Sequence, residues 1–241
     1  MEDGLAGLLW QPQAMPKRGP RPTLTLAAIA AAGIATADAE GLAALTMQRV
    51  AERLAVTKMA LYRYVPGKAE LIALMIEFGV GAPPQDRPED WRAALDGWAR
   101  ALFERFRAHP WSLEATLGLR VMGPNELDWL EYAIAAMDGT GLAGAERFDV
   151  TVTLLGHVRN LAQQVTAIAG PQVHAEAALE SLLGALVRGR EDRFPALAAA
   201  LVSAAAGDGQ DQGLGFGLDR ILDGVALLVA RRAEDSPGRP G

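Results

Sequence analysis

Two short segments of the chain group hydroxyl and cationic side chains in a pattern that suits a phosphate-rich partner. Thr46 and Thr57 each precede a short helical run, so each places a hydroxyl and free backbone N–H groups at a helix N-terminus, where anions are stabilised. The same segments supply cationic donors and tyrosine hydroxyls at Lys58, Arg63, Tyr62 and Tyr64. The pattern favours contacts to a sugar-phosphate backbone, although a helical hairpin in any protein core has a similar one.

A second polar set lies on an otherwise apolar segment. His157, Asn160 and Gln164 follow at steps of three and four, which places them on one face of a helix, with Gln163 beside them. A few polar groups in an apolar site are what orients a small molecule in a pocket. The alternative is that His157 is a hydrogen-bonded histidine in the core or at a helix interface, and the sequence leaves both interpretations open.

Metal and enzyme chemistry find little support. The three histidines, His109, His157 and His174, form no His-x-x-x-His pair, and there is no cysteine. We therefore expect no metal and no cofactor. An all-α enzyme using His157 with Asp149 is the least favoured class, because eight residues of ideal helix separate the two by about 12 Å. The chain also lacks a Gly-x-Ser-x-Gly elbow, a phosphate loop and a dinucleotide fingerprint.

The composition predicts a water-soluble helical protein. Half of the 241 residues are apolar, and no apolar run reaches the roughly 18–20 residues that span a bilayer. Residues 1–22 lack the basic start of a secretory signal, so we expect a cytoplasmic location without a membrane partner. The net charge is −6, yet residues 17–68 hold eight basic and three acidic residues. The excess of positive charge therefore coincides with the segments that carry the threonines.

Apolar residues recur at helical spacing along nearly the whole chain, and no window shows the alternation of a strand. The fold class is therefore predicted to be all-α. The expected helices are 25–40, 47–54, 58–64, 68–79, 91–108, 111–121, 126–137, 143–169, 173–187, 194–205 and 216–232. Thr25 and Asp90 are expected N-caps and Gly41 a C-terminal stop. The expected domains are a flexible arm (1–22), a helix-turn-helix domain (23–80) and an effector-binding and dimerisation domain (84–235), joined at the Pro- and Gly-rich linker 81–88.

The segment Leu24–Met75 closely resembles the DNA-binding domain of the tetracycline-repressor (TetR) family. The match is carried by Glu40-Gly41-Leu42, Val50-Ala51-Glu52-Arg53-Leu54 and Leu61-Tyr62-Arg63-Tyr64-Val65 before Gly67-Lys68. Farther on, His109-Pro110-Trp111, Gly123-Pro124-Asn125 and Phe216–Gly224 resemble the regulatory domain of the tetracycline-repressor branch. One departure is Ala55, which stands where the family usually has glycine. Alanine can occupy this turn position unless the backbone φ is positive.

The resemblance implies a helix-turn-helix whose second helix enters the major groove of double-stranded operator DNA. By position it places Gln48, Lys58, Met59, Ala60 and Arg63 near base edges. Gln48 then suits adenine, Lys58 or Arg63 guanine, and Met59 or Ala60 a thymine methyl. The implied backbone contacts, which position the protein without reading sequence, are Thr46, Thr57, Tyr62, Tyr64 and Lys68.

For the regulatory half, we expect a pocket for a mainly apolar small molecule, lined by Trp98, Phe106, Trp111, Trp129, His157, Asn160 and Gln164. Each aromatic residue taken alone is more typical of an ordinary core. The last helix carries a wide apolar stripe that predicts a homodimer interface, made of Leu218, Ile221, Leu222, Val225, Leu228 and Val229. The predicted function is a ligand-responsive repressor that a small molecule releases from a palindromic operator. A constitutive or architectural DNA-binding protein without effector is the alternative.

Overall fold

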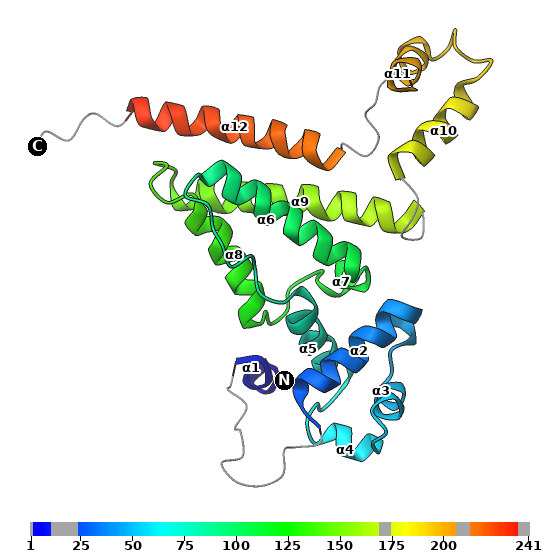
Figure 1. Ribbon diagram of the computed structural model, residues 1–241, viewed down its shortest axis with the longest axis vertical. Helices are drawn as coiled ribbons and strands as arrows, with labels where there is room; N and C mark the ends of the chain where they lie inside the picture. The colour runs from blue at the N-terminus through cyan, green and yellow to red at the C-terminus, as the bar shows by residue number, and fades with distance from the viewer. Residues whose placement is uncertain (1, 11–23, 169–174, 206–212, 236–241) are drawn as a thin grey trace, which may run out of the picture. The chain divides into compact units, whose positions relative to one another are not determined.

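The computed structural model describes residues 2–10, 24–168, 175–205 and 213–235, and all regular structure in these ranges is helical (Figure 1). The all-α prediction is therefore confirmed. The elements are α1 (Glu2–Trp10), α2 (Leu26–Glu40), the short 3₁₀ turn η1 (Leu42–Ala44), α3 (Met47–Arg53), α4 (Lys58–Tyr62), α5 (Lys68–Val80), α6 (Trp91–Ala108), α7 (Trp111–Ala115), α8 (Pro124–Ala136), α9 (Gly144–Ile168), α10 (Ala175–Val187), α11 (Pro195–Ala205) and α12 (Gly213–Asp235). None of the described helices is long and apolar enough to cross a membrane.

Side-chain caps fix where four of these helices begin. Each cap has an extended backbone, and its side-chain oxygen accepts the N–H three residues ahead, which satisfies one of the free donors of the first turn. The caps Thr25, Thr46, Thr57 and Asp90 accept from Ala28, Arg49, Ala60 and Ala93 at 2.8–3.2 Å. The capping residues predicted for α2, α3, α4 and α6 are therefore confirmed.

The N-terminal segment differs from the expectation of an arm over residues 1–22. Residues 2–10 form α1, which packs against α5. The Trp10 Nε1–H donates to the carbonyl of Met122 at 3.0 Å. The prediction was wrong for this stretch because the prolines that indicated an arm all follow Trp10. Residues 11–23, with the basic part of the predicted arm, lie outside the described residues.

The chain forms two compact units, Met1–Gly139 and Thr140–Gly241. The sequence motifs place a domain boundary at the linker 81–88, whereas packing assigns α6–α8 to the same unit as α2–α5. Two hydrogen bonds explain this difference. The Trp129 Nε1–H donates to the carbonyl of Gly81 at 2.9 Å, and the Tyr132 hydroxyl donates to that of Asp86 at 3.2 Å. Side chains of α8 therefore hold the linker in place.

In the first unit, α5 lies at the centre of the core. Its Leu71, Leu74, Met75 and Ile76 are buried, and α2, α7 and α8 pack against it. At Gly33 of α2 a Cβ atom would lie 2.7 Å from the Met75 sulfur, closer than any real contact. The glycine therefore allows α2 to pack directly on the centre of α5.

In the second unit, α9 and α12 pack together. Leu154 and Val158 of α9 and Leu218 and Leu222 of α12 are buried. At Gly217 of α12 a Cβ atom would lie 2.2 Å from the imidazole of His157. A side chain at this position would push the two helices apart.

The turn between α3 and α4 has a left-handed residue. Ala55 has φ +54°, the one positive φ among the described non-glycine residues. This conformation brings a Cβ close to the following carbonyl and costs about 1–2 kcal/mol for a non-glycine residue. The turn is held by backbone bonds from Ala55 N–H to Glu52 O and from Val56 N–H to Ala51 O, both 3.0 Å. The strained position is the one where the family usually has glycine.

We predict that Ala55→Gly stabilises the protein by about 1 kcal/mol, because glycine adopts this backbone without steric cost. Chemical denaturation of wild type and variant gives the difference in the free energy of unfolding. The control is Ala31→Gly, at an exposed position inside α2, which should destabilise by about 1 kcal/mol. A destabilising Ala55→Gly would contradict the assigned turn.

Candidate nucleic-acid interface

The helices α3 and α4 each bury one face and expose the other. Met47, Val50 and Ala51 of α3 and Leu61 of α4 are buried, which anchors both helices on the first unit. Of the ten predicted DNA contacts, Ala60 is half-buried and nine are exposed: Thr46, Gln48, Thr57, Lys58, Met59, Tyr62, Arg63, Tyr64 and Lys68. Met59 exposes 74% of its surface. The predicted residues therefore share an accessible surface.

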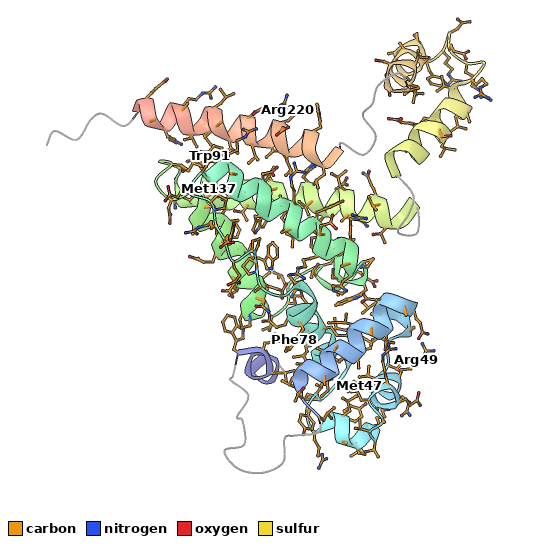
Figure 2. The ribbon with its side chains drawn as sticks, in the orientation of Figure 1. Met47, Arg49, Phe78, Trp91, Met137 and Arg220 are labelled. Carbon is orange, nitrogen blue, oxygen red and sulfur yellow. The ribbon has the colours of Figure 1, made fainter. Side chains whose placement is uncertain are left out.

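Positive charge dominates this surface. Residues 46–68 include five cationic side chains and one acidic one. Arg49 of α3, labelled in Figure 2, is paired with a carboxylate of α2: its Nη1 donates to Glu40 at 2.5 Å. The Lys58 ammonium lies 5.7 Å from the centre of the Tyr62 ring, within the range of a cation–π contact. Because Lys58, Tyr62 and Arg63 are also exposed, an anionic partner can reach them.

A carboxylate on α2 joins the helix-turn-helix to α6 and α7. Asp38 accepts from the His109 Nδ1–H at 2.9 Å and from the Trp111 Nε1–H at 2.8 Å. Both rings also lie against Gly79 of α5, where a Cβ atom would be 3.4–3.6 Å from them. Trp111 is 5% exposed, so its N–H group has to find an acceptor inside the protein. We call Asp38, His109 and Trp111 the α2–α7 clamp.

A second carboxylate joins α5 to the start of α8. Glu77 accepts the backbone N–H of Asn125 at 3.0 Å, and the Asn125 amide donates to the carbonyl of Glu77 at 2.9 Å. At Gly123 a Cβ would lie 2.0 Å from the Glu77 carboxylate, so glycine leaves room for it. The pKa of Glu77 is raised above its ordinary value, chiefly because the carboxyl is partly buried. The nearby carboxylates of Glu126 and Asp128 raise it further, and the hydrogen bond from the Asn125 N–H lowers it. The C-terminal part of α5 is thus held to α8 by Glu77 and lies against the rings of His109 and Trp111 at Gly79.

Comparison with known proteins decides the family. The model of the bacterial regulatory proteins of the tetR family matches residues 29–75, and that of the tetracyclin repressor-like C-terminal domain matches residues 83–229. The chain belongs to the TetR family. Proteins of this family are transcriptional regulators, so this TetR-family chain is a regulator and not an enzyme.

Individual relatives agree with this assignment. The chain is 38% identical over 244 residues to the HTH-type transcriptional repressor DrrR1 of Streptomyces coeruleorubidus, covering 95% of this chain and 88% of that protein. It resembles the apo structure of ActR from Streptomyces coelicolor with a TM-score of 0.71 and 24% identity, over 90% of this chain and 100% of that one. The complex of ActR with actinorhodin gives a TM-score of 0.70 and 23% identity, over 84% and 95%. The structural likeness shows the fold.

The predicted aromatic pocket residues of this TetR-family chain form much of the first unit's core. Trp98, Phe106, Trp111 and Trp129 are each at most 5% exposed. The Trp98 Nε1–H donates to the carbonyl of Trp129 at 2.8 Å, and the two rings meet edge to face. A cavity of about 360 Å³ borders one of them, Trp129. Its other lining residues include Pro83, Pro84, Ala101, Gln85 and Arg105. Their role in binding an effector stays a prediction.

The polar part of the predicted pocket lies in the second unit. The imidazole of His157 packs on Gly217, and its Nε2 lies 3.3 Å from the carbonyl of Leu214 on α12. Asn160 and Gln164 are exposed, and the Gln164 amide donates to the Asn160 side-chain oxygen at 2.7 Å. A contact between helices therefore accounts for His157 without a ligand.

The predicted dimer residues divide into two groups. Leu218, Leu222 and Val225 are buried, and Ile221, Leu228 and Val229 are half-buried. α12 packs on α9 of the same chain, which accounts for part of the stripe. Large apolar side chains nevertheless remain exposed on both helices, at Phe148, Val152, Phe216 and Leu227. Sequence reasoning did not select these four, since it could not fix how each helix is rotated.

We predict that Asp38→Ala lowers the free energy of unfolding by about 1–3 kcal/mol, because it leaves the buried Trp111 N–H without an acceptor. Trp111→Phe removes that donor, so the double variant should lose less stability than the sum of the two single variants. Chemical denaturation measures all four proteins. Asp96→Ala is the matched control: it removes a half-buried carboxylate that bonds the exposed Arg100 on α6, at a cost of about 0.5 kcal/mol or less. Strict additivity would contradict the clamp.

Proposed function

We propose that this protein is a cytoplasmic repressor that binds a palindromic operator as a homodimer and leaves it when a small molecule binds. The observation that carries the proposal is the exposed polar and cationic face of α3 and α4, built on a buried apolar face. The similarity to the repressor DrrR1, 38% identical over nearly the whole chain, supports repression rather than activation.

The order of residues on α4 supports a division between base and backbone contacts. Lys58, Met59 and Ala60 occupy its first turn, and the N-terminal residues of a recognition helix are those that meet base edges. The N-cap Thr57 leaves N–H groups of that turn toward solvent, where a phosphate oxygen can accept them. Tyr62 and Tyr64, each about one-third exposed, then contact the sugar-phosphate backbone, and Arg63 reaches a guanine.

Exposed apolar side chains on α9 and α12 support the homodimer. Phe216 and Leu227 are 67% and 64% exposed, after α12 has buried its other face on α9. At Gly224 a Cβ would meet nothing within 4 Å, so this side of α12 is open to a partner helix. A two-fold dimer presents two recognition helices to two half-sites about one DNA turn apart, ~34–36 Å.

An effector is supported by the size of the domain that follows the helix-turn-helix and by ActR, which was solved with actinorhodin bound. To release DNA, the effector has to bind one conformer better than the other. A coupling of about 1–3 kcal/mol weakens operator binding about 5- to 150-fold, and operator weakens effector binding by the same factor. The α2–α7 clamp is the contact through which a shift of α6 and α7 reaches α2.

We predict that Arg63→Ala costs about 1–3 kcal/mol of operator affinity and relaxes the base preference at one position per half-site. Lys68→Ala should weaken binding to all sequences alike and flatten the salt dependence, since it removes a phosphate contact. Fluorescence anisotropy with operator and shuffled duplexes at several salt concentrations separates the two effects. Unchanged affinity and preference in Arg63→Ala would contradict the recognition assignment.

We also predict that Leu227→Glu yields monomers by analytical ultracentrifugation at micromolar concentration and loses operator binding in parallel. The new carboxylate would be buried in the proposed interface without a partner of opposite charge, which separates the subunits. A monomer then contacts only one half-site and binds the operator weakly. Leu119→Glu, at a fully exposed apolar position of the first unit, is the control and should stay dimeric. A monomeric wild type would refute the dimer.

A further inference from the structure

Glu52 is an acidic residue on a surface that phosphates should repel. Between Thr46 and Lys68 it is the only carboxylate, against five cationic side chains. It is exposed on α3, in the helix-turn-helix. A negative charge here weakens binding to every DNA sequence, so electrostatics alone gives no reason for it.

The contact of Glu52 provides a reason. The Gln48 Nε2–H donates to Glu52 Oε1 at 2.7 Å, one turn apart on the exposed face of α3. Arg49, the other polar residue of that turn, is bonded to Glu40 and directed to α2. Of these two pairs on α3, the one formed by Gln48 and Glu52 lies wholly on the exposed face of the helix, beside the exposed Arg53.

The bond leaves Gln48 with a defined set of free groups. A glutamine amide has two N–H donors and one carbonyl acceptor, and Glu52 occupies one donor. The remaining N–H and the carbonyl match the N7 acceptor and N6 donor on the major-groove edge of adenine. Fixing the side chain before DNA arrives also removes part of the ordering cost of binding.

We propose that Glu52 is a specificity-determining residue that positions the Gln48 amide for an adenine in each half-site. The inference rests on the proposed operator binding. The charge of Glu52 lowers affinity for all sequences, while its bond to Gln48 sharpens the preference for one base.

The test is enrichment from a randomised duplex library with wild type, Gln48→Ala, Glu52→Ala and Glu52→Gln, all as full chains. A bidentate amide–adenine contact discriminates against other bases roughly 5- to 150-fold. Gln48→Ala should lose this preference at one position per half-site, and Glu52→Ala should lose most of it at the same position. A double variant carrying Gln48→Ala and Glu52→Ala, enriched in the same way, should lose no more of the preference than Gln48→Ala alone.

Glu52→Gln separates the bond from the charge, because it keeps a side-chain acceptor oxygen and removes the charge. It should retain the adenine preference, whereas both Glu52 variants should bind shuffled DNA more tightly than wild type does. The inference is overturned if Glu52→Ala keeps the preference, if it alters a different position, or if Glu52→Gln loses the preference as fully as alanine. A wild type that enriches no sequence would instead contradict the operator binding itself.

Discussion

The arrangement of the first unit depends on the need of one buried N–H group for an acceptor. Trp111 brings its indole nitrogen into the core, and Asp38 of α2 is the group that accepts it, together with the N–H of His109. Because an unsatisfied buried donor is costly, α2 is held against α6 and α7 in one orientation. Gly79 lets both rings lie close to α5, so the helix-turn-helix and helices α6–α8 belong to one compact unit.

The surface that we propose to face DNA follows from local rules applied within that unit. Threonine caps set the first residues of α3 and α4, and the left-handed Ala55 sets the angle between them. The buried faces then direct the polar residues outward, where Gln48 is bonded to Glu52 and Arg49 to Glu40.

Much of this was predictable from the sequence. The caps and the fold class rest on short-range rules, and the start of each predicted helix from α2 to α6 lies within a residue or so of the structure. The missed features are of two kinds. α1 was hidden by neighbouring prolines, and the α2–α7 clamp joins residues about seventy positions apart, which no local pattern reveals. Aromatic composition alone cannot distinguish a packed core from a pocket; in the structure the Trp98 Nε1–H donates to the Trp129 carbonyl and the Trp129 Nε1–H to that of Gly81. The Gln48–Glu52 bond could have been predicted from the sequence, since the two residues are one helical turn apart.

The most direct test of the account is hydroxyl-radical footprinting of the purified protein on its own genomic DNA. The account predicts two protected half-sites related by a two-fold axis and about one helical turn, ~34–36 Å, apart. Lys58→Ala should lose this protection, while Leu119→Glu should keep it. Protection without a repeated sequence, or equal protection by wild type and Lys58→Ala, would contradict the claim that α3 and α4 read an operator.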